Sequence, residues 1–67
     1  MKPATPDAQL TAAKAIARRN GLFISAKDGK YHVYRAMAPR NIHLGFRRTP
    51  ADLFDYIEHL TRVEVHP

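Results

Sequence analysis

The sequence predicts an α+β domain in which a helix, a three-stranded antiparallel sheet and a second helix follow one another, with both helices on one sheet face. Apolar residues recur at helical spacing near both ends of the 67-residue chain and alternate with a period of two between them. Turn signals divide the alternating part into three short runs. Residues 1–67 are expected to form a single domain with a thin core, and the lack of cysteine excludes a disulfide or thiolate zinc site.

The first element is predicted as a helix from Pro6 to about Arg19, after a flexible lead-in over residues 1–5. Thr5 can cap this helix, and proline at its first position costs no hydrogen bond. The turn signal Asn20-Gly21 ends the helix. Its apolar stripe consists of Leu10, Ala13, Ile16 and Ala17.

Three strands are predicted next, over residues 22–26, 31–37 and 41–47. The first two flank Lys27-Asp28-Gly29-Lys30, whose Asp-Gly pair is typical of a tight hairpin. A second turn at Ala38-Pro39-Arg40 precedes the third strand. These signals favour a simple antiparallel meander.

The last helix is predicted to begin at Pro50, with Thr49 as its cap and Asp52 three residues after the cap. Its buried stripe is expected to consist of Leu53, Ile57 and Leu60. Residues 64–67 are expected to form a flexible tail.

Period-two alternation predicts which side chains of the sheet face away from the helices. The inner set is expected to be Leu22, Ile24, Ala26, Tyr31, Val33, Ile42, Leu44 and Phe46. Arg35 also falls on this side, where its stem can snorkel to water. The open face then carries Phe23, His32, Tyr34 and His43, with Lys27, Lys30, Arg40, Arg47 and Arg48 around them.

The charge distribution indicates a polyanionic partner. The chain carries a net charge of +5, and nine of its 11 Lys and Arg residues lie between Lys14 and Arg48, where Asp28 is the only acid. Aromatic rings on a sheet can stack on unpaired bases while nearby cations hold phosphates. The predicted nucleic-acid-binding residues are therefore Lys27, Lys30, His32, Tyr34, Arg40, His43, Arg47 and Arg48.

Residues 29–35 (Gly-Lys-Tyr-His-Val-Tyr-Arg) resemble the Gly-Ser-His-His-Ile/Val-Tyr-Arg segment of HicA-type toxins. Those are small RNA-cleaving proteins whose fold is akin to the double-stranded-RNA-binding domain, and the order of elements matches over most of residues 8–62. The position of their catalytic histidine is occupied here by Tyr31, and tyrosine is a poor base at neutral pH. The resemblance implies the fold and RNA as the partner, slightly ahead of DNA, but no catalysis.

Residues 29–31 (Gly-Lys-Tyr) followed by residues 41–52 (Asn-Ile-His-Leu-Gly-Phe-Arg-Arg-Thr-Pro-Ala-Asp) also resemble plant ethylene-response-type domains and the arm-binding domains of phage integrases. Those domains lay a three-stranded sheet into the DNA major groove. Ala36 and His43 stand where that family has DNA-contacting Arg and Trp, so its contacts are not implied.

Other kinds of site find little support in the sequence. His32 and His43 can be cross-strand neighbours, but two histidines are fewer than the three protein ligands of a catalytic zinc site, so neither a metal nor a cofactor is expected. Ser25 has no evident His and Asp partners for a hydrolytic triad. No apolar run approaches the length of a membrane span, and a cytoplasmic protein is expected.

The alternative is a protein-interaction module, such as a phage-borne accessory or regulatory protein. It would dock through the acidic last helix or a sheet edge, or form a homodimer by pairing basic sheet with acidic helix. A nucleic-acid binder should lose affinity with added salt and when Arg47 and Arg48 become Ala. A docking module should instead show a defined oligomer or protein partner.

Overall fold

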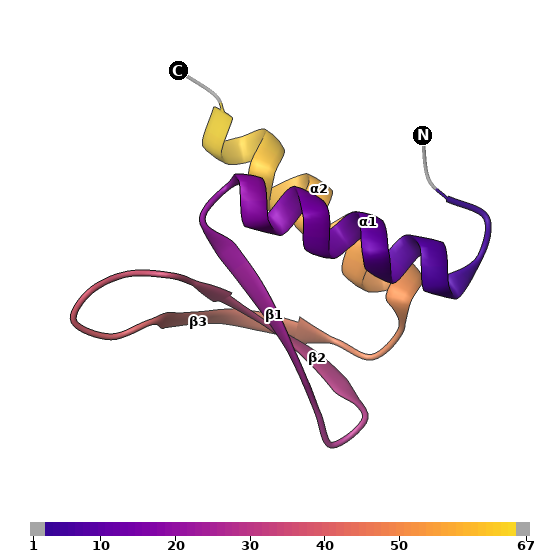
Figure 1. The fold of residues 1–67 in the computed structure, drawn as a ribbon, viewed down its shortest axis with the longest axis horizontal. Coiled ribbons are helices and arrows are strands. Elements are labelled where there is room, and N and C mark those ends of the chain that lie inside the picture. Colours follow the sequence, from indigo (N-terminus) through magenta and orange to yellow (C-terminus); the bar gives the residue numbers. More distant parts are fainter. Residues whose placement is uncertain (1–2, 66–67) are drawn as a thin grey trace.

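The computed structural model describes residues 3–65 and confirms the predicted fold class. Three strands form a sheet of order β1-β2-β3 in which both neighbouring pairs are antiparallel. Two helices pack against each other over one face of this sheet and run in the same direction (Figure 1). The elements are α1 (Pro6–Arg19), β1 (Leu22–Lys27), β2 (Lys30–Arg35), β3 (Ile42–Arg47) and α2 (Pro50–Val65).

Both helices begin at the predicted threonine caps. Thr5 Oγ1 accepts a hydrogen bond from the backbone N–H of Ala8 (3.2 Å), and Thr49 Oγ1 accepts one from that of Asp52 (3.1 Å). Each bond satisfies a donor of the first helical turn that has no partner within the helix.

The ends of the chain differ from the predicted lead-in and tail. The Pro3 carbonyl accepts a hydrogen bond from Gln9 Nε2 (3.0 Å), which ties the lead-in to α1. Helix α2 continues to Val65, so residues 64–65 of the predicted tail belong to the helix. Residues 1–2 and 66–67 lie outside the described part of the chain.

The first hairpin has the turn that its Asp-Gly pair predicts. Asp28 and Gly29 both have positive φ values, 55° and 73°, as the mirror-image turn of a two-residue hairpin requires. Lys27 and Lys30 pair across this turn, so β1 is one residue longer than predicted. Strand β2 ends at Arg35, two residues before the predicted end.

The core lies between the helices and the helix-side face of the sheet. Helix α1 contributes only alanine to its fully buried part, so α1 and α2 can approach closely. Phe54, which is not part of the predicted stripe of Leu53, Ile57 and Leu60, is also buried. The buried set is Ala13, Ala17, Leu22, Val33, Leu53, Phe54 and Ile57.

A β-bulge in β3 changes which side chains face the helices. Val33 pairs with Gly45 and Tyr34 with His43, which leaves Leu44 as an additional residue on β3. Beyond the bulge, Phe46 pairs with His32 of the open face. The prediction that Phe46 belongs to the core is therefore wrong, because strict alternation fails across an added residue.

The bulge has the opposite effect on Arg47. This residue pairs with Tyr31, whose side chain packs against the core, so Arg47 faces the helices. The prediction that Arg47 faces outward is wrong for the same reason. Ile42, also expected in the core, is 46% exposed, since it begins β3 next to a connection (36–41) that is exposed throughout.

Candidate nucleic-acid interface

Five rings form a continuous row across the open face of the sheet. We call Phe23, Tyr34, His43, His32 and Phe46 the aromatic row. Phe23 and Tyr34 are stacked, with ring centroids 5.1 Å apart and planes inclined by 12°. Tyr34 meets His43 edge to face at 5.1 Å, His43 lies 5.2 Å from His32, and His32 lies 5.7 Å from Phe46. The row thus reaches from one edge strand to the other.

The register of the three strands brings these rings together. His32 and Tyr34 are two residues apart on the central strand β2 and therefore share a face. Phe23 lies opposite Tyr34 on β1, while His43 and Phe46 lie opposite Tyr34 and His32 on β3. Residues three apart on a regular strand point to opposite faces, so the bulge is what places His43 and Phe46 on the same one.

The two histidines at the centre of the row contact each other directly. His32 Nδ1 and His43 Nε2 are 3.1 Å apart, a hydrogen-bonding distance in which one nitrogen carries the proton and the other accepts it. Among the described residues, no group of three or more His, Cys, Asp or Glu side chains could hold a metal ion. The pair forms a polar centre between the apolar ends of the row.

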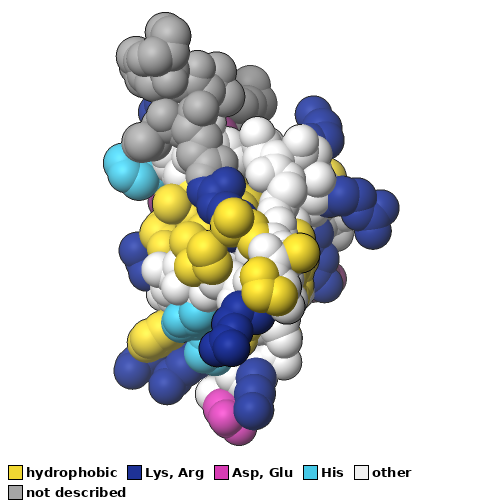
Figure 2. Space-filling model, turned by 90° about the vertical axis from the view of Figure 1, so that its left-hand side faces the viewer, with side chains coloured by type: hydrophobic (Ala, Val, Ile, Leu, Met, Phe, Trp, Pro, Cys, Tyr) yellow, Lys and Arg dark blue, Asp and Glu magenta, His cyan; other side chains and the backbone are white. Residues whose placement is uncertain are grey.

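Positive charge on this face is concentrated at the hairpin end. Lys30 Nζ lies 4.9 Å from the centroid of the Phe46 ring, and Lys27 pairs with Lys30 and so shares its face. Figure 2 shows histidine side chains next to hydrophobic and basic side chains on the side of the molecule that it presents. The face therefore combines rings and ammonium groups.

The structure assembles five of the eight predicted site residues and separates the other three. Lys27, Lys30, His32, Tyr34 and His43 share the open face. Arg40 lies in the exposed connection before β3, and Arg48 lies exposed between β3 and α2. Lys and Arg side chains also reach both sides of the view in Figure 2, so the expectation that positive charge gathers on the open face is wrong in part.

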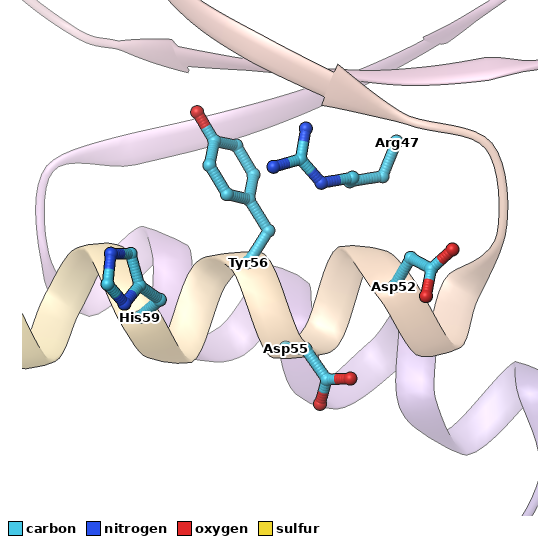
Figure 3. Close-up of a pocket in the computed structure, with 5 residues that line it drawn as sticks. All are labelled: Arg47, Asp52, Asp55, Tyr56 and His59. Atoms are coloured by element: carbon cyan, nitrogen blue, oxygen red, sulfur yellow. The ribbon is translucent and has the colours of Figure 1, made fainter.

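Arg47 belongs to a pocket on the helix side of β3. Its guanidinium carbon lies 4.0 Å from the centroid of the Tyr56 ring, and Figure 3 shows it extending from the strand toward that ring. Tyr56 Oη donates a hydrogen bond to the Leu44 carbonyl at the bulge (3.1 Å). Asp52, Asp55 and His59 of α2 complete the lining. These contacts attach α2 to β3 and explain why Arg47 does not reach the open face.

Sequence reasoning missed Phe46 as a residue of the site. The signal that could have identified it is Gly45, because a glycine inside a predicted strand often marks a bulge or a close approach of another group. Phe23 was expected on the open face but not among the binding residues, and it forms one end of the row.

No protein-family model, curated protein or solved structure matches this chain in comparisons with known proteins. Within residues 3–65, no helix has the length and apolar character needed to cross a membrane.

Proposed function

We propose that the protein binds nucleic acid through the aromatic row together with Lys27 and Lys30. The observation that carries this proposal is the continuity of the five rings over an open sheet face. Its end rings are solvent-accessible, with Phe23 39% and Phe46 36% exposed. Stacking of a base on an aromatic side chain contributes about 1–3 kcal/mol, so even two such contacts give useful affinity.

Electrostatic attraction also favours nucleic acid as the partner, but it should contribute less to the binding affinity than the sequence suggested. The chain carries a net charge of +5, which favours approach to a polyanion. Among the Lys and Arg residues of the three described strands, only Lys27 and Lys30 share the face with the rings by register. For two phosphate contacts, the logarithm of affinity for a single strand should fall with the logarithm of salt with a slope of about −1.4.

The finer parts of the proposal come from the sequence. RNA is placed slightly ahead of DNA because residues 29–35 resemble an RNA-directed family. The site is proposed to be non-catalytic, since Tyr31 replaces that family's histidine and its side chain packs against the core rather than in the row. The proposal places the protein in the cytoplasm.

A binding screen at low ionic strength tests the proposal. Labelled RNA and DNA oligonucleotides of about 12 nucleotides, long enough for a small site, are titrated with the protein in about 20 mM salt. We expect binding, with NMR shift changes at residues of the aromatic row and little change on the exposed side of α1. Lack of binding to every probe would overturn the proposal.

A protein-docking role is the second candidate, and a specific observation favours it. Met37 and Ile42 are 49% and 46% exposed; Met37 lies in the connection between β2 and β3, and Ile42 is the first residue of β3. Neighbouring apolar side chains that together form an exposed patch often mark contact surfaces. A homodimer or other partner that uses them should be weakened by Met37→Ser or Ile42→Ser, as sedimentation or pull-down would show, whereas binding of RNA should not change.

A further inference from the structure

We infer that the ligand of this interface is a single strand with unpaired bases, and that its bases stack on Phe23 and Phe46 at the two ends of the aromatic row. This inference rests on the proposed nucleic-acid function and narrows its substrate class. It follows from the ring surface that Phe23 and Phe46 leave accessible to a base, and from the position of Arg47 away from the open face.

Phe23 stacks one ring face on Tyr34 and is still 39% exposed. Its near-parallel stacking on Tyr34, at 5.1 Å, occupies the side toward the central strand. Strand β1 is at the edge of the sheet, so no further strand covers the opposite side. A base placed there would extend an existing stack of two rings.

Phe46 combines a ring with a cation. It lies on the other edge strand, tilted by 44° against His32, and Lys30 Nζ is 4.9 Å from its centroid. A nucleotide consists of a flat base and a phosphate a short distance away. A base that stacks on Phe46 would take the place of the Lys30 ammonium over the ring, and the flexible Lys30 stem would let this ammonium move to the phosphate of the same nucleotide. This end of the row therefore offers both parts of a nucleotide a contact.

A duplex fits the face less well. Each base in a duplex is covered on both sides by its neighbours, and inserting a side chain between them costs a few kcal/mol per step. Readout of base edges in the major groove of DNA relies on hydrogen-bonding side chains, of which arginine is the commonest. Arg47, the arginine of β3, points instead into the pocket with Tyr56. The open side of the sheet instead exposes aromatic rings, on which unpaired bases can stack.

The test compares single-stranded and duplex RNA at one salt concentration. A labelled oligo(U) of about 12 nucleotides and an RNA duplex of about 12 base pairs are titrated with wild-type protein and with Phe23→Leu and Phe46→Leu. Leucine keeps an apolar side chain but removes the ring. Each variant should bind the single strand about 5- to 150-fold more weakly, the equivalent of ~1–3 kcal/mol, and should bind the duplex as the wild type does.

Two controls separate this inference from the broader function. Met37→Leu replaces an exposed apolar side chain outside the row and should leave both affinities unchanged. Lys27→Gln with Lys30→Gln removes the charges of the face. One outcome would overturn the inference but not the proposed nucleic-acid binding. In it, the charge variant loses binding to both duplex and single strand, while the two leucine variants bind as the wild type does. Failure of the wild type to bind either RNA would overturn both. Thermal melting confirms that each variant is folded.

Discussion

The β-bulge that presents Phe46 depends on the absence of a side chain at position 45, and this dependence can be tested by Gly45→Ala. A Cβ atom there would lie 2.6 Å from Tyr56 Oη and 3.3 Å from Tyr56 Cζ. The phenol is anchored, because Tyr56 Oη donates to the Leu44 carbonyl and the Arg47 guanidinium lies over its ring. It cannot move away from the new methyl group without losing these contacts.

The expected effects follow from this geometry. Overpacking of this kind costs about 1–3 kcal/mol, and the lower entropy of the unfolded chain with alanine returns about 0.4–1 kcal/mol. Gly45→Ala should therefore lower the free energy of unfolding by up to about 2.6 kcal/mol. Tyr56→Phe removes one hydrogen bond and should lower it by about 0.5–1.5 kcal/mol. The double variant has no oxygen to clash, so it should be more stable than the sum of the single effects predicts by about 1 kcal/mol.

Urea unfolding followed by circular dichroism measures this cycle. For a domain of this size, a difference of about 1 kcal/mol corresponds to about 4–8 °C in Tm, well above the error of a melt. Tyr34→Phe is the matched control, since Tyr34 lies on the opposite face of the sheet and should show no coupling to Gly45→Ala. Additivity of Gly45→Ala and Tyr56→Phe within about 0.5 kcal/mol would refute the proposed packing.

Three further predictions use the same assays. Gly29→Ala should lower the free energy of unfolding by about 1 kcal/mol because alanine is strained at a φ of 73°; an unchanged urea midpoint would contradict this. Thr49→Ala should cost about 1 kcal/mol through loss of the cap to Asp52, while Thr49→Ser should be close to wild type in the same melts. Lys30→Gln should weaken binding of oligo(U) about fivefold or more at low salt, whereas Arg47→Gln should change it by less than about twofold; equal losses would place both cations at the ligand.

Local signals were sufficient to predict every element of the fold. The two threonine caps, the Asp-Gly turn and the change from helical to period-two spacing are properties of neighbouring residues, and each is present in the structure. Local signals did not predict the side of the sheet to which the side chains after Gly45 point. That side depends on how β3 pairs with β2. The bulge accommodates a phenol from α2, a contact between residues 12 positions apart that no local pattern contains.

The change of face at the bulge also changes the physical basis of the proposed function. The sequence suggested a cationic sheet decorated with rings, in which attraction to phosphates would provide most of the affinity. In the structure, Phe46 lies on the open face and Arg47 does not. Compared with the predicted face, the open face therefore has one charge fewer, and its row of rings extends to the edge of the sheet. Affinity of such a face should come mainly from stacking of bases on the rings, while the phosphate contacts of Lys27 and Lys30 orient the backbone and supply the salt-dependent part. Binding that is retained in the leucine variants but abolished by moderate salt would therefore contradict this order of contributions, even with the location of the site unchanged.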